Sequence, residues 1–426
     1  VDENLLHIFL KIDGDNRATA ILPHSEMGQG AQTALTQMLA EEMDADWNLM
    51  RFEEAPANAE YANMAVGRGY LFKGIDFPDV VVPTVDGLML NLADALGMQI
   101  TGGSMSIRTT GQYFLRAAGA SVREMLVKTA SKAWGVPESE IRTAKSMLHH
   151  DSSGRLAPYS EFAAAAAEMT PSSTPKLKKT SQFSVMGHSK PRHDIPSKVD
   201  GTAMFAMDVK RPGMVYAAVK RTPVAGGTLR RVDDNAARAM KGVIDVVKVG
   251  PSSAAGLVGT YSAGDTIAVV ADSYWTAEKA LASLKLEWNT EGKERVSSES
   301  IFEQFDRDIT AGVDRANDVA MGDATAAFDS AATVLTADYR VPYLAHTCME
   351  PPNATAEVFA DRAEIWVGCQ NPLGFRQHLA ANLGLDVQQV TLHNYFMGGG
   401  FGRKSNADYA LQAAMIARQV LSLIHI

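Results

Sequence analysis

The chain alternates between two spacings of apolar residues, one typical of strands and the other of helices. Residues 5–21 alternate apolar and polar side chains around Asp13-Gly14-Asp15-Asn16, which predicts a β-hairpin. Apolar residues three and four positions apart predict helices at 33–43 and 111–133. The same criteria predict further strands at 51–55, 215–220, 242–250, 266–272, 333–341, 356–359, 363–367 and 390–395, and further helices at 273–284, 300–305, 374–383 and 408–420.

Changes in composition along the chain indicate several domains of the α+β class. Segments 163–167 and 171–175 are rich in Ala, Pro and Ser, which is typical of a linker. Residues 187–292 carry enough strands and helices for an α+β unit of their own, whereas residues 293–332 are polar and resemble a connecting segment. The expected divisions are 1–170, 171–186, 187–292, 293–332 and 333–420, followed by a tail at 421–426 that is foreign to the gene.

The bulk composition excludes some classes of protein. The chain has 426 residues, of which 46% are hydrophobic, and this is enough for two or three cores. Its net charge of −9 gives it no electrostatic reason to bind nucleic acid or an anionic membrane. The densest basic run, at 176–179, is interpreted as a solvated linker. No apolar segment reaches the roughly 20 residues that span a bilayer.

Cysteine and histidine are too few and too scattered for a metal centre held by side chains. The two cysteines, Cys348 and Cys369, cannot ligate an iron–sulfur cluster, which normally needs more thiolates. A disulfide between them is compatible with the sequence, but no framework pattern supports it. The ten histidines include no zinc-type pair at helical spacing. Any clusters that pass electrons are therefore expected on another chain.

Three loops of small residues lie next to predicted helices, at 26–30 (Glu-Met-Gly-Gln-Gly), 101–106 (Thr-Gly-Gly-Ser-Met-Ser) and 397–403 (Met-Gly-Gly-Gly-Phe-Gly-Arg). Glycine lets the backbone approach a ligand closely, and free N–H groups at a helix start favour anionic oxygens. A large phosphate-bearing ligand and three ordinary turns are equally good interpretations. Because the chain has neither the P-loop pattern nor the Gly-x-Gly-x-x-Gly fingerprint, ATP and NAD are disfavoured.

The residues of these loops resemble one known family. Residues 397–404 resemble the Gly-rich segment of the xanthine dehydrogenase and aldehyde oxidase family, and 368–372 (Gly-Cys-Gln-Asn-Pro) resembles its strand-end glutamine motif. Segments 26–30 and 101–104 resemble two further pterin-binding segments. Because 26–30 precedes the Gly-rich segment, the resemblance is greatest to the isoquinoline 1-oxidoreductase large-subunit branch. It covers nearly the whole chain and implies a molybdopterin-binding large subunit, lacking its C-terminal part, with a hammerhead-like α+β domain between two cofactor-binding regions.

The resemblance implies roles for individual residues. Gln370 would hydrogen-bond an oxo ligand of molybdenum, and Gln29 would contact the pterin or its phosphate. The dithiolene sulfurs of the cofactor would hold the metal, so no side chain needs to ligate it directly. The other implied cofactor contacts are Gly28, Gly30, Thr101, Gly103, Ser104, Ser106, Gly399, Gly400, Phe401, Gly402 and Arg403.

The resemblance also implies the chemistry and the partners. In this family a metal-bound hydroxide attacks an electron-poor carbon, hydride passes to a sulfido ligand, and a glutamate acts as base. That glutamate is expected beyond Val420. The cofactor would be molybdopterin in its cytosine dinucleotide form, and electrons would pass to a small subunit with two [2Fe-2S] clusters. Arg403-Lys404-Ser405 stands where purine-oxidising members have a glutamate, so an N-heteroaromatic or aldehyde substrate is favoured over a purine.

Less specific interpretations of the same residues stay open. Without the family, Gln370 is a strand-end polar group, Gln29 is a turn residue, and Glu26 is a helix N-terminal charge. The alternatives for the whole chain are an inactive cofactor-binding fragment and a non-enzymatic ligand-binding or assembly module. The compartment is open between periplasm and cytoplasm, because the twin-arginine signal common in this branch would lie upstream.

Four charged or titratable residues near the last loop have competing interpretations. His346 and Glu350 suit a structural role better than a metal pair. Lys404, with Arg403, either solvates the loop or contacts phosphate.

Overall fold

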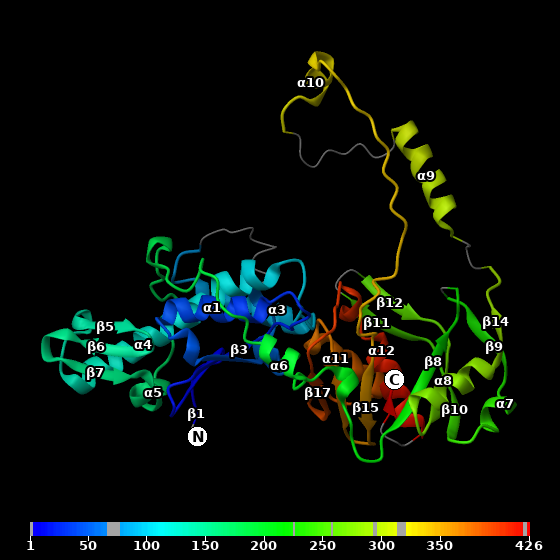
Figure 1. Cartoon of the computed structure of the whole chain (residues 1–426), viewed down its shortest axis with the longest axis horizontal. Helices are drawn as coiled ribbons and strands as arrows, with labels where there is room; N and C mark the ends of the chain where they lie inside the picture. Colours follow the sequence, from blue (N-terminus) through cyan, green and yellow to red (C-terminus); the bar gives the residue numbers. More distant parts are fainter. Residues whose placement is uncertain are drawn as a thin grey trace. The chain divides into compact units, whose positions relative to one another are not determined.

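The computed structural model describes residues 3–65, 77–224, 226–256, 259–292, 296–312, 321–420 and 424–426. The chain divides into two compact units, and each is described by itself: Val1–Asn289 together with Cys348–Ile426, and Thr290–Thr347. Figure 1 traces the chain from its blue to its red end. Helices and strands are mixed throughout, which confirms the α+β class. Within the described ranges, no helix combines the length and apolar character needed to cross a bilayer.

The first part of the larger unit is a four-stranded sheet with two long helices packed together. Its elements are β1 (Glu3–His7), β2 (Leu10–Asp13), β3 (Ala18–Leu22), α1 (Ala31–Met43), β4 (Met50–Glu54) and α4 (Arg116–Trp134). β4 pairs parallel to β3, and the other neighbours are antiparallel. A Cβ at Gly119 of α4 would collide with the Leu39 carbonyl of α1, so glycine allows this close helix contact. The predicted hairpin, the strand at 51–55 and both helices are confirmed.

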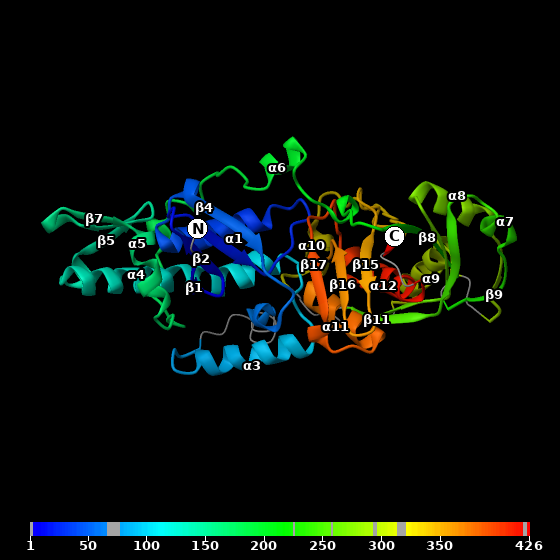
Figure 2. The ribbon, with the colours of Figure 1, turned by 90° about the horizontal axis from the view of Figure 1, so that it is seen from below.

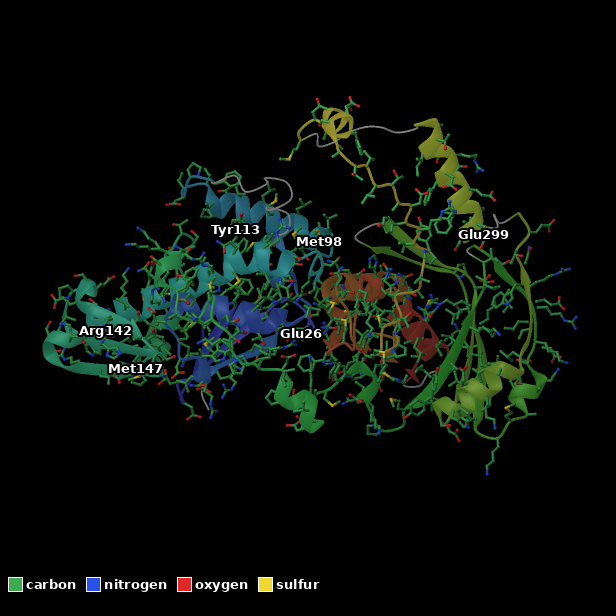
Figure 3. All side chains as sticks on the ribbon, turned by 45° about the horizontal axis from the view of Figure 1, so that its top comes forward. Glu26, Met98, Tyr113, Arg142, Met147 and Glu299 are labelled. Atoms are coloured by element: carbon green, nitrogen blue, oxygen red, sulfur yellow. The ribbon has the colours of Figure 1, made fainter. Side chains whose placement is uncertain are left out.

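A small antiparallel sheet and a helix follow α4, and the spacing of apolar residues did not predict them. They are β5 (Ile141–Ala144), β6 (Met147–His150), β7 (Arg155–Pro158) and α5 (Tyr159–Ala167). Arg142 and Met147, labelled in Figure 3, lie on this sheet. The interpretation of 163–167 as a linker is wrong, because Ala163 and Ala166 are buried in the core on α5. Alanine is the strongest helix former, and a run of alanines shows no apolar period.

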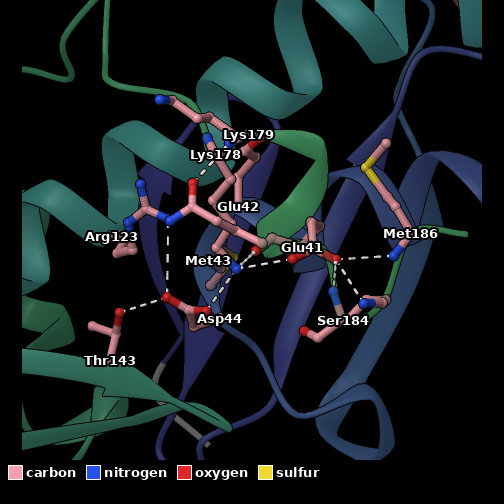
Figure 4. Close-up of polar contacts among 12 residues, drawn as sticks. Glu41, Glu42, Met43, Asp44, Arg123, Thr143, Lys178, Lys179, Ser184 and Met186 are labelled. Atoms are coloured by element: carbon pink, nitrogen blue, oxygen red, sulfur yellow. Dashed lines mark hydrogen bonds and ion pairs between the residues drawn. The ribbon is translucent and has the colours of Figure 1, made fainter.

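The segment 171–186, predicted as a linker, is fastened to the C-terminal end of α1 (Figure 4). The Glu41 carboxylate accepts hydrogen bonds from the backbone N–H groups of residues 184–186 at 2.8, 2.6 and 2.9 Å. Lys178 donates to Glu41 at 2.9 Å and to Asp44 at 2.6 Å. Burial alone would raise the pKa of Glu41, but these donors lower it. The interpretation of the basic run as solvated is therefore wrong for Lys178, whose side chain is only 10% exposed.

The second part of the larger unit is a seven-stranded sheet in the order β10-β13-β8-β18-β15-β16-β17. Its strands are β8 (Val215–Arg221), β10 (Val243–Val249), β13 (Thr266–Ala271), β15 (Ala354–Val358), β16 (Ala363–Val367), β17 (Val390–Asn394) and β18 (Ile424–His425). Figure 2 shows β15, β16 and β17 side by side. The first six strands confirm predicted ones. β18 lies in the tail expected to be foreign, and it pairs with both β8 and β15.

Four helices and two further strand pairs accompany this sheet. They are α7 (Asn235–Arg238), α8 (Tyr274–Ser283), α11 (Pro372–Leu383) and α12 (Asp408–Val420), with β9 (Thr228–Asp233) paired to β14 (Lys285–Asn289) and β11 (Ser252–Gly256) paired to β12 (Gly259–Ala263). Tyr409 of α12 meets Phe375 of α11 edge-on, with ring centroids 5.7 Å apart. The helices predicted at 273–284, 374–383 and 408–420 are confirmed, whereas the two strand pairs were not predicted.

Three further helices belong to the larger unit. They are α3 (Val82–Ala95), the π-helix η3 (Ser106–Leu115) and α6 (Ile195–Asp200). The helix predicted at 111–133 therefore starts earlier, as a π-helix. A Cβ at Gly111 of η3 would lie 3.0 Å from Leu35 on α1, so the widened turn packs closely on that helix.

The smaller unit contains α9 (Ser298–Ala311) and α10 (Ala324–Ser330). α9 extends the helix predicted at 300–305 in both directions. The strand predicted at 333–341 is wrong: in the described part of the chain these residues are exposed and pair with no strand. Alternation along one segment produces a strand only when a second strand satisfies its backbone N–H and C=O groups.

Candidate cofactor-binding site

A cavity of about 770 Å³ brings the three Gly-rich loops together with Gln370. The predicted cofactor contacts that line it are Gly28, Gln29, Gly30, Thr101, Gly103, Ser104, Ser106, Gln370, Gly400, Phe401 and Gly402. The lining also includes Met27, Ala31, Ala34, Gly102 and Ile107, which were not predicted. Gly399 and Arg403 are absent from the described lining. The binding role of each residue stays a prediction.

Gln370 lies just beyond the end of β16, and its carboxamide joins two of the loops. Its Nε2 donates to Thr101 O at 2.9 Å, and its Oε1 accepts from the Gly402 N–H at 3.0 Å. The backbone reinforces this arrangement, because the Thr101 N–H donates to Gln370 O at 2.8 Å. The side chain is buried. An amide nitrogen carries two N–H groups, so Gln370 can offer one to a ligand while the other holds the loop.

The first loop is organised around the buried carboxylate of Glu26, labelled in Figure 3. Its Oε1 accepts from the N–H groups of Gly28 at 3.0 Å and Gly30 at 2.9 Å, and its Oε2 accepts from Gln32 at 3.3 Å. Arg192 donates to Glu26 at 3.3 Å and to Gly28 O at 3.0 Å. Glu26 thus supplies an internal anion at the start of α1. This carboxylate gives the loop its shape before any ligand binds.

Gln29 lines the cavity, but its own side chain braces the loop. Its Oε1 accepts from the Met27 N–H at 2.7 Å, and its Nε2 donates to Ser25 O at 3.1 Å. The geometry therefore shows the turn-forming role that the isolated sequence allowed. A ligand contact would use the remaining hydrogen-bonding capacity of the same carboxamide.

A buried histidine supports the second loop. His24 Nδ1 lies 3.3 Å from Thr101 Oγ1 and 3.2 Å from Ser106 Oγ, and its Nε2 lies 2.8 Å from Thr110 Oγ1. Burial lowers the pKa of His24 to about 3, so the ring is neutral and pairs with hydroxyls on both sides. Sequence reasoning missed His24, because a lone histidine after a strand carries no signal.

The third loop brings its backbone against the cavity. A Cβ at Gly400 would lie 2.7 Å from Gln370 Oε1 and 2.8 Å from Met27 Sδ, so only glycine fits there. Phe401 has a φ of +51°, and its side chain is 66% exposed. The loop therefore meets a ligand mainly through peptide groups.

The two cations after this loop are paired with carboxylates. Arg403 contacts both oxygens of Asp408, each at 2.8 Å. Lys404 is buried and donates to Glu350 Oε2 at 2.6 Å, an oxygen that also accepts the Gly398 N–H at 2.9 Å. The interpretation of Lys404 as a solvated loop residue is wrong, because its side chain points into the protein and pairs with the buried Glu350 carboxylate. Glu350 has a structural role.

The described lining of the cavity includes no charged side chain. Among the residues whose positions are described, no group of three His, Cys, Asp or Glu side chains could hold a metal ion. Cys348 and Cys369 are both free thiols, and Cys348 Sγ lies 3.6 Å from Gly400 O. A ligand in this cavity would meet peptide groups, hydroxyls, carboxamides and apolar side chains.

Comparison with known proteins identifies the class of cofactor. Residues 306–425 match the molybdopterin cofactor-binding domain. The chain is also similar to the molybdenum-binding subunits of an aldehyde oxidoreductase and of a xanthine dehydrogenase of Escherichia coli. The predicted family resemblance is confirmed. Two of the four segments that line the cavity, the loops at 26–30 and 101–106, lie outside the matched domain.

The similarity to curated relatives runs along almost the whole chain. Isoquinoline 1-oxidoreductase subunit beta of Brevundimonas diminuta is 30% identical over 97% of this chain and 53% of its own length. A membrane-bound aldehyde dehydrogenase [pyrroloquinoline-quinone] of Gluconacetobacter polyoxogenes is 28% identical over 96% of this chain and 48% of its own. The chain thus spans about half the length of these relatives. Among solved structures, quinoline 2-oxidoreductase from Pseudomonas putida 86 matches 56% of this chain and 34% of its own, with 21% identity and a TM-score of 0.41.

Proposed function

We propose that the chain is the cofactor-binding part of the large subunit of a molybdenum hydroxylase that oxidises an N-heteroaromatic compound or an aldehyde. The oxygen comes from water, and the electrons leave through a small partner subunit with two [2Fe-2S] clusters. One observation carries the proposal: segments far apart in the sequence, at 26–30, 101–106, 370 and 400–402, line a single cavity. The names of the two curated relatives support the two substrate classes.

The residues of the cavity fit a molybdopterin. The metal of this cofactor is held by the cofactor's own sulfur atoms, so the protein needs to supply backbone and amide contacts rather than Cys or His ligands. Gly400 leaves room that a Cβ would fill, and the Cβ position of Gly102 has no heavy atom within 4 Å. The hydroxyls of Ser104 and Ser106, with the loop N–H groups, suit phosphate oxygens.

Each loop has its own task in this proposal. Gln370 would offer its second N–H to the metal centre, while the peptide N–H groups of 400 and 401 and the Gln29 carboxamide would hold the pterin; the Gly402 N–H already donates to Gln370. Gly103, Ser104 and Ser106 would hold the nucleotide end, in the cytosine dinucleotide form. When bound, molybdopterin supplies the two-electron redox centre for hydroxylation with water. The neutral lining excludes competing side-chain ligands from the metal.

The residues that follow the third loop support a substrate other than a purine. Lys404 is committed to Glu350 and Arg403 to Asp408, so both carboxylates are neutralised. At 403–405 the chain offers none of the acidic groups that the resemblance associates with purine oxidation.

The test measures molybdenum content and turnover in the whole large subunit of which this chain is proposed to be a part, produced together with its partner subunit in cells that make the cofactor. The wild type should carry molybdenum and oxidise isoquinoline or an aromatic aldehyde, with a dye as electron acceptor. Gly400→Ala should lower the molybdenum content, because the new Cβ would crowd Gln370. Gly250→Ala is the matched control, since its Cβ position is open.

The outcomes separate the two candidate functions. A wild type without molybdenum contradicts the proposal. Molybdenum without turnover of either substrate class favours the alternative, a cofactor-binding module without activity of its own.

A further inference from the structure

We propose that Glu54 is a positioning residue. From outside the cavity it fixes the relative positions of all three cofactor loops, through Ser25 and Asn394. The proposal rests on the proposed function, since it concerns the same cavity. In the described lining of that cavity, none of these three residues is present. Glu54 was not predicted as a site residue, because it ends a strand at 50–54 far from the recognised motifs.

The Glu54 carboxylate collects three side-chain donors at one point. Its Oε1 accepts from Ser25 Oγ at 3.0 Å and makes a short contact with Asn394 Nδ2. Its Oε2 accepts from Gln32 Nε2 at 3.3 Å. These donors come from the segment before the first loop, from the end of β17 and from α1, respectively. A single carboxylate therefore connects three separate elements.

The arm through Ser25 reaches the first two loops. Ser25 directly precedes Glu26, whose carboxylate shapes the first loop. The Ser25 N–H donates to Thr101 Oγ1 at 2.9 Å, at the start of the second loop. Gln32 adds a second tie, because its Nε2 also donates to His24 O at 2.9 Å. A displacement of Ser25 would therefore move both loops.

The arm through Asn394 reaches the residues around Gln370 and the third loop. Asn394 Oδ1 accepts from the Cys369 N–H at 2.8 Å, and its Nδ2 donates to Cys369 O at 3.2 Å. Cys369 immediately precedes Gln370. Three residues after Asn394, the Met397 N–H donates to Glu26 O at 3.0 Å, where the third loop begins. The two arms also meet directly, because Asn394 Nδ2 donates to Ser25 Oγ at 2.8 Å.

A buried carboxylate at position 54 is unfavourable when it is charged, and an uncharged side chain of the same size would avoid this desolvation cost. Burial raises the pKa of Glu54 to about 7, although its three donors lower it, and the nearby Glu26 carboxylate raises it further. A carboxylate accepts hydrogen bonds with both oxygens and offers no competing N–H. Glutamine at 54 would turn an amide group toward the amide of Asn394 or Gln32, so at least one tie would be lost.

The alternative is that Glu54 only stabilises the fold, and the experiment separates the two roles. Glu54→Gln and the control Glu53→Gln are produced as full chains with the partner subunit and the maturation machinery. Glu53 is the adjacent residue on the same strand, and its exposed side chain pairs with Lys11 at 2.8 Å. Three quantities are measured: the rate of molybdenum loss on dialysis, kcat against KM, and the melting temperature of cofactor-free protein.

We expect Glu54→Gln to lose molybdenum roughly 10–100-fold faster than Glu53→Gln, since residues behind a metal's immediate surroundings have effects of this size. kcat should fall with little change in KM, and the cofactor-free melting temperatures of the two variants should be similar. Glu54→Asp, which keeps the charge, should recover part of the retention. Equal molybdenum retention in both Gln variants would overturn the proposal, as would a loss explained by a matching drop in melting temperature. A wild type without molybdenum would instead overturn the proposed function.

Discussion

The side-chain amide of Gln370 donates to the carbonyl of Thr101 at 2.9 Å, across 269 positions of the sequence. The same side chain accepts a hydrogen bond from the Gly402 N–H, so one residue links the second loop to the third. A cofactor in the cavity would lie against a surface whose shape depends on this carboxamide. Gln370 is therefore expected to matter twice, once for the cavity's shape and once for the ligand.

Gln370→Ala should lower both stability and molybdenum content. The substitution leaves Thr101 O and the Gly402 N–H without their partner, and an unsatisfied buried polar group costs about 1–3 kcal/mol. Urea unfolding and metal analysis of the purified protein measure the two effects. Gln388→Ala, at an exposed position, should change neither quantity. A variant with unchanged molybdenum content would show that Gln370 does not shape the cavity.

Lys404→Met should be more destabilising than removal of both members of its ion pair. The single variant leaves the buried Glu350 carboxylate without its cation, which typically costs about 3–5 kcal/mol. Lys404→Met with Glu350→Gln removes the uncompensated charge and should recover part of the loss. Chemical denaturation of the two single variants and the double variant gives the coupling energy. If the double variant equals the sum of the single ones, the pair is not coupled.

Glu54 should make the protein less stable as the pH rises from about 4.5 to 7. Burial raises the pKa of Glu54 from 4.5 to about 7, so within this window the folded protein keeps a proton that the unfolded chain releases. Its contribution is fully present below pH 4.5 and is lost as the pH passes 7. Glu54→Gln has no such titrating proton. As the pH rises, the wild type should therefore lose unfolding free energy relative to the variant. A difference that does not vary with pH would be inconsistent with the raised pKa.

His24 should have the opposite pH dependence. Burial lowers the pKa of His24 from 6.5 to about 3. Between these two pH values the unfolded chain therefore binds a proton that the folded protein does not bind. The unfolding free energy should therefore fall as the pH drops from about 6.5 toward 3. Comparing the wild type with His24→Asn over this range isolates the effect, because asparagine does not titrate. A wild type that gains stability relative to the variant on acidification would refute the assignment.

Retention of molybdenum should depend little on salt. The described lining has no charged side chain, so peptide groups and hydroxyls, rather than screened ion pairs, would hold the phosphates of the proposed cofactor. The molybdenum content after gel filtration at low and at high salt should be the same. Substantial loss at high salt would point to a cation that contacts the phosphates.

Local sequence was sufficient for several features of this protein. The period-two alternation of residues 5–21 and the helical spacing of 33–43 and 408–420 predicted elements that the structure contains. The loops at 26–30 and 397–403 were also visible, because glycine is needed wherever a backbone takes a positive φ or approaches a ligand closely. Such requirements act within a few residues, so they leave a mark in the local sequence.

Other features depended on residues that meet only in the folded chain. The alanines at 163–167 could be linker or helix until α4 and the first sheet buried them, and residues 333–341 had strand-like alternation but no strand to pair with. Glu54 contacts Asn394, which is 340 positions away in the sequence. The Lys404 side chain is buried because it pairs with the buried Glu350 carboxylate. Burial, and the long-range hydrogen bonds that burial requires, are decided by tertiary packing, and a one-dimensional pattern carries no record of either.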